Sequence, residues 1–329
     1  MPLTLSEMKV AMSDKVAQQV VDIFLRNSEI LQMLPFDNCV SPQGGSTLTY
    51  SYVQKKLPSM AAFRALNTEY TPGHAALETK HVDLKIFGGS FEIDRVLKQT
   101  EGQYNNMAFQ MKEKILAAIS LFHHTLINGD ATTKADEFDG LDKMLAGTTS
   151  EFGADTVIDV STIDKLKTNA DQFYEALQIL IKETQADALL MNTSTIAKIQ
   201  TLARILGYKT ESEEAFGRKV VSMDGVRFMD LGKHYTVSGG TATANDCVKA
   251  GISRTVGTAQ TGLTDIFGVK FDVNDGFHAA SPTGDRAIHQ YLPDFTKPGA
   301  VKTGEVEMVA ATVLKNTAHA GVLRNIKIA

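Results

Sequence analysis

This chain has little of what marks secreted or membrane-bound proteins. Among its 329 residues are only two cysteines, Cys39 and Cys247. Two distant thiols without a Cys or His at metal-ligand spacing make no disulfide framework, so we expect both to be reduced in a cytoplasm. No apolar run reaches the length of a membrane span, and the first residues lack a basic region followed by an apolar one. The sequence therefore predicts no membrane segment and no signal peptide.

The chain also lacks a concentration of positive charge. It carries 33 Lys and Arg against 38 Asp and Glu, a formal net charge of −5. Its densest basic runs are pairs such as Lys55 and Lys56. A protein that grips nucleic acid needs clustered cations to displace counterions from phosphates. If this protein lies near nucleic acid, it encloses it without sequence-specific binding.

Motifs of known catalytic chemistry are missing as well. There is no GxSxG turn and no GxxxxGKS/T phosphate loop, and Gly251, Gly257 and Gly262 are too far apart for a dinucleotide-binding motif. His123 and His124 are neighbours on an expected helix, where successive side chains point about 100° apart. We therefore expect a helix-surface pair there, and no cofactor, metal or catalytic residue. A hydrolase or transferase built from scattered carboxylates is a distant alternative.

The first segment present is an arm. An apolar face predicts an amphipathic helix within residues 4–34, and Pro35 ends it because proline has no backbone donor. Thr4 and Glu7 have the spacing of a capping box at its start, and Ser13 is an alternative start. The apolar face packs either on the chain's own core or on a neighbouring subunit.

A polar two-stranded segment follows the arm. Apolar residues at period two predict a strand and a return strand. The two faces are Leu48, Tyr50 and Tyr52, and then Val82, Leu84 and Ile86. Between them lie about twenty-five residues rich in Lys, Pro, Gly and Ala, and a connection of that length is usually functional or disordered. We interpret the whole as an extended hairpin projecting from the body, with a mobile surface loop as the alternative.

One unusually long amphipathic helix comes next, from Gln103 to Ile127. Its apolar residues recur in steps of three and four. At ~1.5 Å per residue it would be roughly 37 Å long. Gly129 supplies a natural stop. The single apolar stripe predicts a helix that packs with one side along a sheet. An acidic, solvated turn around Asp139 is expected after it.

The second half alternates between helix and strand patterns. A further amphipathic helix is expected from Ile163 to Ile181, and a buried central strand at residues 188–191. Thr193 or Ser194 then caps a helix that closes at a glycine.

Strand character increases toward the C-terminus. Asp224 and Gly225 stand between two apolar runs and predict a two-residue hairpin turn. Residues 232–303 are rich in Gly, Thr, Ala and Asp, and we expect mostly loops and short strands there. Residues 307–328 return to strand character.

Together these segments resemble the major capsid proteins of tailed bacteriophages, which have the HK-ninety-seven-type capsid fold. The fragments that suggest it are LINGD at 126–130, FDGL at 138–141, ADALLMN at 186–192 and GVLRNIKI at 321–328. Each is weak alone, and the resemblance rests on their order along nearly the whole chain. It implies an α+β protein with an N-terminal arm, an extended β-hairpin loop, a long spine helix on a β-sheet and a mixed α/β axial domain.

The resemblance also implies a division of the chain. Residues 1–36 would be the arm, 37–99 the extended loop over an adjacent subunit, 100–160 the peripheral domain with the spine helix at 103–127, 161–305 the axial domain and 306–329 a C-terminal strand returning to the peripheral domain. Such subunits form pentamers and hexamers that close into an icosahedral shell around double-stranded DNA. The location would be the virion, assembled in the host cytoplasm.

The same resemblance implies partner proteins for the chain and one alternative function. The chain begins almost directly at the arm, which suggests a separate scaffolding protein unless the chain is already processed. The resemblance implies a portal as a further partner besides the chain itself. An encapsulin, a nanocompartment with the same shell fold around a cargo enzyme, is the nearest rival. We do not predict crosslinking, since Lys55 and Lys56 lie in the right loop but no partner Asn and Glu can be identified.

The expected inter-subunit contacts lie on the hairpin. Lys55, Lys56 and Arg64 would pair with acidic groups on a neighbour, and Tyr50 and Tyr52 would pack the hairpin base. All five belong to a segment too thin to bury enough of itself alone.

Overall fold

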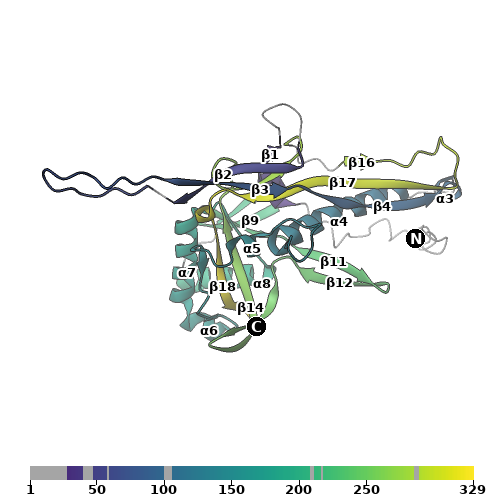
Figure 1. Ribbon diagram of the computed structural model, residues 1–329. Helices are drawn as coiled ribbons and strands as arrows, with labels where there is room; N and C mark the ends of the chain where they lie inside the picture. Colours follow the sequence, from purple (N-terminus) through teal and green to yellow (C-terminus); the bar gives the residue numbers. More distant parts are fainter. Residues whose placement is uncertain are drawn as a thin grey trace.

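The computed structural model describes residues 28–39, 47–57, 59–99, 106–207, 211–215, 218–284 and 289–329. Figure 1 shows a long, flat upper layer, a rounded lower lobe and a thin hairpin that projects far beyond both. The expected α+β architecture is confirmed, with a long helix on a sheet and a mixed lobe beside it. Most of the expected arm lies outside the described residues, which begin just before the short helix α2 (Glu29–Met33). Pro35 follows the end of α2 as predicted, and Ile30 and Leu34 are buried in the core.

The upper layer is a five-stranded sheet covered by the long helix α4 (Asn106–Asn128). Its path is β1 (Phe36–Asn38), β15 (Phe277–Ser281), β17 (Val301–Leu314) and β16 (His289–Tyr291), with β4 (Lys85–Asp94) paired to β17. The helix packs against β4 and β17 along its length. The spine helix is therefore confirmed, and its described part ends at Asn128, one residue before the predicted stop at Gly129.

The lower lobe contains a nine-stranded sheet. Its path is β5 (Glu151–Phe152), β18 (Ala320–Lys327), β14 (Thr258–Val269), β7 (Ala188–Met191), β10 (Val226–Asp230), β9 (Arg218–Met223) and β8 (Glu211–Ala215), with β13 (Ala250–Val256) paired to β14 and β6 (Ile158–Asp159) paired to β18. The strand character expected at residues 307–328 thus corresponds to two strands in different sheets. Strand β17 belongs to the upper layer and β18 to the lobe.

Strand β7 explains how the two layers share one body. Its four residues are all fully buried, because alternate side chains enter two different cores. Leu189 and Met191 face the lobe helices, whereas Ala188 and Leu190 join the core beneath α4. The prediction of a buried central strand at 188–191 is confirmed.

The lobe helices are α6 (Ile163–Thr168), α7 (Ala170–Thr184) and α8 (Thr193–Leu206). The single helix expected from Ile163 to Ile181 is wrong, because Asn169 breaks it and its side chain donates to the Asp159 carbonyl at 2.8 Å. Asn192, and neither Thr193 nor Ser194, caps α8 through its side-chain oxygen.

Residues 232–303 hold much more strand than expected. Besides β13 to β16, an exposed ribbon forms from β11 (Lys233–Ser238) and β12 (Thr241–Asp246). The expected turn at Asp224 and Gly225 is confirmed, with φ of 55° and 78° as the mirror-image hairpin turns require.

The projecting hairpin consists of β2 (Thr49–Leu57) and β3 (Ala76–Asp83). Tyr50 pairs with Val82 as the two apolar faces predicted. Leu48 precedes β2 and is exposed, so it was wrongly placed on the covered face. Ile86 belongs to β4 in the upper sheet, because the chain leaves the hairpin at Leu84. Short helices α3 (Arg95–Gln99) and α5 (Leu141–Leu145) and the 3-10 turn η2 (Thr317–His319) complete the chain.

The histidine pair on α4 corrects a further prediction. His123 is buried, and its Nδ1–H donates to the Leu231 carbonyl at 2.9 Å, which leaves Nε2 to accept from the Ser28 hydroxyl at 2.6 Å. The half-buried His124 ring lies 5.0 Å from the His234 ring of the ribbon, at a tilt of 38°. The pair is not a surface feature, since the α4 stripe is wide enough to be covered by α2 and β11 as well as by the sheet.

Candidate functional site

The base of the β2–β3 hairpin is fixed to the body by three polar contacts. The Tyr50 hydroxyl donates to the Asp37 carboxylate on β1. The Tyr52 hydroxyl donates to the Leu314 carbonyl at 3.2 Å, and the Gln54 amide to the Lys315 carbonyl at 3.0 Å. Burial, followed by the hydrogen bond to Asp37, raises the pKa of Tyr50 far above its ordinary value, so the phenol stays a donor.

The partly buried Lys315 and the buried His278 lie beside the Tyr50 ring in this base. The Lys315 ammonium lies 5.4 Å from the centre of the Tyr50 ring, and His278 meets the ring edge-on at 5.6 Å. His278 is fully buried, and neither ring nitrogen makes a hydrogen bond of good geometry with the described residues. Burial, then the charge of Lys315, lowers the pKa of His278 to about 4. The ring is therefore neutral near pH 7.

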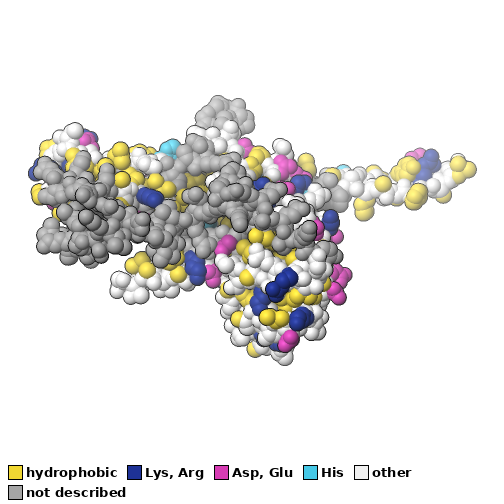
Figure 2. Space-filling view, turned by 180° about the vertical axis from the view of Figure 1, so that it is seen from behind, with side chains coloured by type: hydrophobic (Ala, Val, Ile, Leu, Met, Phe, Trp, Pro, Cys, Tyr) yellow, Lys and Arg dark blue, Asp and Glu magenta, His cyan; other side chains and the backbone are white. Residues whose placement is uncertain are grey.

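The far end of the hairpin, residues 59–75, is hereafter the tip. Its large apolar side chains are Met60, Phe63, Leu66 and Tyr70, exposed by 86%, 107%, 88% and 60%. Figure 2 shows hydrophobic side chains along the whole projecting arm, with basic and acidic groups near its end. No described part of the chain covers them. Exposed apolar surface of this kind marks an interaction site.

Arg64 has a local role at the tip. Its guanidinium donates to the Thr68 carbonyl at 3.1 Å and lies 5.4 Å from the centre of the Tyr70 ring. Asn67 adopts a left-handed backbone with φ of 65° in the same turn. The tip thus has internal order although it packs on nothing else.

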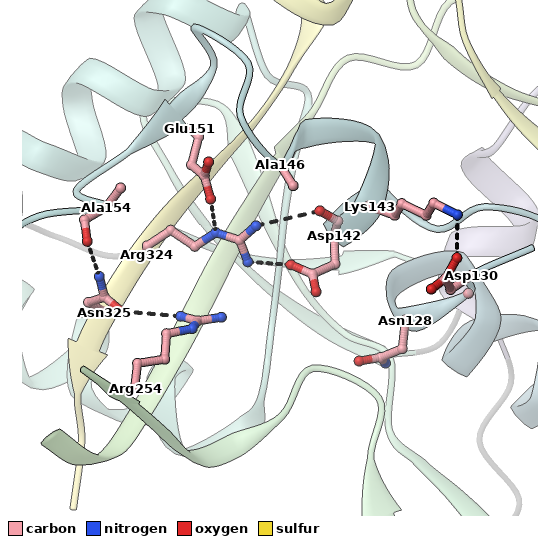
Figure 3. Close-up of a pocket in the computed structure, with 11 residues that line it drawn as sticks. Asn128, Asp130, Asp142, Lys143, Ala146, Glu151, Ala154, Arg254, Arg324 and Asn325 are labelled. Atoms are coloured by element: carbon pink, nitrogen blue, oxygen red, sulfur yellow. Dashed lines mark hydrogen bonds and ion pairs between the residues drawn. The ribbon is translucent and has the colours of Figure 1, made fainter. Parts of the chain in front are cut away.

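A second candidate site is a charged pocket of about 390 Å³ between α5, β13 and β18. Arg324 of β18 lies at its centre (Figure 3). Arg324 donates through Nε to Glu151 at 2.8 Å and through Nη1 to Asp265 at 3.0 Å and to Asp142. Arg254 binds both oxygens of Asp265, at 2.5 and 2.6 Å.

The electrostatics of this pocket favour a structural tie over acid–base chemistry. Burial raises the pKa of Asp265, but the hydrogen bond from Arg254 and the charges of both arginines outweigh it, and the pKa lies below its ordinary value. The pKa of Glu151 is lowered in the same way, against its burial, by the Gly147 amide and Arg324. A general acid working near neutral pH needs a raised carboxyl pKa, and these two carboxyls have the opposite shift.

The acidic turn after α4 belongs to the edge of this pocket. Lys143 of α5 binds Asp130 and lies 3.0 Å from Asp139. The turn is therefore ordered by ion pairs, and residues 132–136 within it are exposed, in agreement with the expected solvated turn.

The sequence-predicted contact residues fall into three groups. Tyr50 and Tyr52 anchor the hairpin to its own subunit, Arg64 lies at the exposed tip, and Lys55 and Lys56 lie in β2 with side chains outside the described set. A contact of any of the five with a neighbour stays a prediction. Sequence reasoning missed the Arg324 pocket, whose signal is the polar pair Arg324 and Asn325 between apolar residues of the C-terminal strand β18.

Comparisons with known proteins identify the fold but no sequence family. No protein-family profile and no curated protein matches the chain. A chain of the holo-SrpI encapsulin complex from Synechococcus elongatus superposes with a TM-score of 0.62 at 12% identity, covering 100% of this chain and 97% of that one. A chain of Mycobacterium phage Bobi gives 0.58 at 12% identity, covering 99% of both chains. The capsid of a native GTA particle gives 0.53 at 11% identity, covering 95% of this chain and 99% of that one.

These superpositions run from end to end. The chain has the HK-ninety-seven-type fold found in phage capsids and encapsulins, as the order of its segments predicted. No described helix is long and apolar enough to cross a membrane.

Proposed function

We propose that this chain is a major capsid protein, which assembles into pentamers and hexamers of an icosahedral shell enclosing double-stranded DNA. The observation that carries the proposal is the hairpin tip, which exposes Phe63 and Leu66 almost completely on a fold shared with phage capsids over its full length. An apolar tip at the end of a thin arm gains burial only on another molecule.

Assembly would proceed through many weak, repeated contacts. Apolar burial contributes about 25 cal/mol per Å². The entropy lost on association offsets much of that gain for any single contact. Closed symmetry repeats each contact around a ring and over a shell. The particle therefore stays assembled when any single contact breaks. No catalytic step is part of this function.

The parts of the chain take roles accordingly. Residues 1–36 would be an arm, 37–99 the loop over a neighbour, 100–160 with β17 the peripheral domain and 161–305 the axial domain around the fivefold and sixfold centres. Strand β18 would belong with the axial domain, because it pairs with β14 in the lobe sheet. A separate scaffolding protein and a portal would complete assembly in the host cytoplasm. DNA would be enclosed without sequence-specific contacts, in line with the net charge of −5.

An encapsulin-type compartment around a cargo enzyme is the second candidate. The similarity to the encapsulin chain, at a TM-score of 0.62, favours it. The particle content separates the two: DNA that resists nuclease supports the capsid, and a co-purifying enzyme supports the compartment.

Electron microscopy of the purified protein is the direct test. Uniform hollow particles or rings are expected, whereas dispersed monomers at high concentration would leave the proposal without support and favour a soluble enzyme. Deleting residues 56–76 should give capsomers or monomers that fail to close. That deletion keeps Tyr50, Tyr52 and Gln54, so the circular dichroism spectrum of the body should stay unchanged.

A further inference from the structure

A groove lies at the base of the hairpin, where β3 meets the body. Its volume is about 360 Å³, within the size range of sites that take one bulky group. The apolar part of its lining is Tyr52, Val82, Phe138, Met144 and Leu314. Phe138 and Leu314 belong to the rigid core, whereas Met144 is only partly buried and its thioether can adapt to an incoming side chain.

The rim of the groove is charged. Lys80, Asp83, Lys85 and Asp139 stand around it, so both signs are present. Lys80 is exposed and makes no ion pair with the described residues. A polar rim around an apolar floor is the usual form of a protein contact site.

The tip and the groove match in chemistry. Phe63 and Leu66 are the two most exposed large apolar residues of the tip. Glu69 lies beside them, exposed and, like Lys80, in no ion pair with the described residues. The Arg64–Thr68 hydrogen bond and the Arg64–Tyr70 contact already fix the turn, so docking would cost little conformational entropy.

The tip of one subunit cannot fill its own groove. Phe63 at the tip lies eleven positions after Tyr52 at the groove, roughly 35 Å of extended chain. Figure 1 shows the hairpin running straight away from the body. An occupant that carries such a tip must therefore be another copy of the chain.

We propose that Phe63 of one subunit, with Leu66 beside it, inserts into the groove between β3 and α5 of the next subunit, where Glu69 meets Lys80. This deepens the proposed function and rests on it. The contact is head-to-tail, since each copy gives a tip and receives one. A head-to-tail contact closes into a ring when the rotation between copies divides a full turn.

A pair of introduced cysteines tests the contact. The native Cys39 and Cys247 are both buried, so they should form few disulfide bonds between subunits. The double variant Phe63→Cys, Met144→Cys should form a ladder of disulfide-linked oligomers under mild oxidation of assembled particles, read on a non-reducing gel. A mixture of the two single variants should give only dimers. The matched control is Phe63→Cys with Val237→Cys, because Val237 is 71% exposed on the β11–β12 ribbon, away from the groove.

The outcomes separate this inference from the proposed function. The contact between tip and groove is supported if particles form and the disulfide-linked oligomers appear only when Met144→Cys is present. Particles that form without the ladder, or with an equal ladder from Val237→Cys, overturn it and leave the shell proposal standing. Absence of particles from the unmodified chain overturns both.

A second variant tests the same contact without introduced cysteines, which could themselves disturb assembly. Phe63→Ala should raise the protein concentration needed for assembly at least tenfold, with an unchanged circular dichroism spectrum because Phe63 is fully exposed. Met60→Ala, at a similarly exposed tip position, should change it less than threefold. Equal effects of the two variants would contradict Phe63 as the anchor.

Discussion

The amide of Gly140 donates a hydrogen bond to the carbonyl of Gly129 at 2.9 Å. This contact joins the segment before α5 to the end of the spine helix α4. A Cβ on Gly129 would lie 2.2 Å from the Phe138 carbonyl oxygen, and one on Gly140 would lie 2.6 Å from the Ile127 and Thr125 carbonyl oxygens. The two glycines of LINGD and FDGL are therefore needed because two backbones cross in contact.

Gly140→Ala should destabilise the subunit. Backbone atoms surround the new methyl group and cannot move aside as a flexible side chain would, so the cost should be about 1–3 kcal/mol. Thermal unfolding monitored by circular dichroism measures it. Gly73→Ala is the matched control, because nothing lies within 4 Å of a Cβ there, and it should leave the melting temperature unchanged. An equal melting temperature for both variants would contradict the crossing as a constraint.

Arg324→Met should be the most damaging single change in the charged pocket. It leaves Asp265, whose side chain is 4% exposed, with Arg254 as its remaining ion-pair partner, and it leaves Glu151 without an ion pair among the described residues. Removing one member of a buried ion network costs about 3–5 kcal/mol. Urea unfolding gives the free energy.

The control for Arg324 is an exposed ion pair. Lys297 lies 3.4 Å from Asp294 and its side chain is 78% exposed. Lys297→Met should change the unfolding free energy by less than about 1 kcal/mol. If Arg324→Met were as mild as this control, the pocket would not tie β18 to α5 and β14.

The sequence predicted well those helices, strands and turns that depend on interactions between residues close together in the chain. The α4 stripe, the all-apolar β7 and the Asp224-Gly225 turn each depend on residues close along the chain. The overall fold followed from the order of such segments. Asn169 shows the limit, since it breaks a helix through a contact with Asp159 that no helical pattern contains.

The candidate sites depend on distant residues, and the sequence predicted them poorly. Arg324 meets Asp142 and Glu151 across more than 170 positions of sequence, so only the topology brings the pocket together. The burial of His123 likewise depends on Ser28 and Leu231. The projection of the hairpin was predictable from its thin, polar composition, but the order within its tip was not.

Acid should destabilise the subunit through its buried histidines. Burial lowers the pKa of His123 and of His278 to about 4, below the unfolded value of about 6.5. The unfolded chain therefore binds protons that the folded one does not between these values. Stability is complete above about pH 6.5 and falls as the pH drops toward 4, by about 1.4 kcal/mol per pH unit for each histidine. Urea unfolding at a series of pH values measures this slope.

The two histidines should respond differently to replacement. His278→Leu removes no hydrogen bond of good geometry, so stability at pH 7 should hold and the acid slope should become shallower. His123→Leu leaves the Ser28 hydroxyl and the Leu231 carbonyl without their partner and should cost about 1–3 kcal/mol at pH 7. An unchanged acid slope in His278→Leu would exclude His278 as a source of the acid sensitivity.

Tyr50→Phe should loosen the hairpin from its own subunit before it affects the rest of the fold. The variant keeps the ring between His278 and Lys315 but removes the hydroxyl that donates to Asp37. A hydrogen bond to a charged group contributes about 1.5–3 kcal/mol, and Asp37 keeps the hydrogen bond from the Asn38 amide and a distant ion pair with Lys315 at 4.0 Å. Limited proteolysis should then cut within residues 59–75 or at the hairpin base several-fold faster. Tyr291→Phe is the control, because that side chain is 54% exposed on β16 and its hydroxyl can bond to water in either state. Equal cleavage rates for the two variants would mean that the Tyr52 and Gln54 contacts alone hold the hairpin in place.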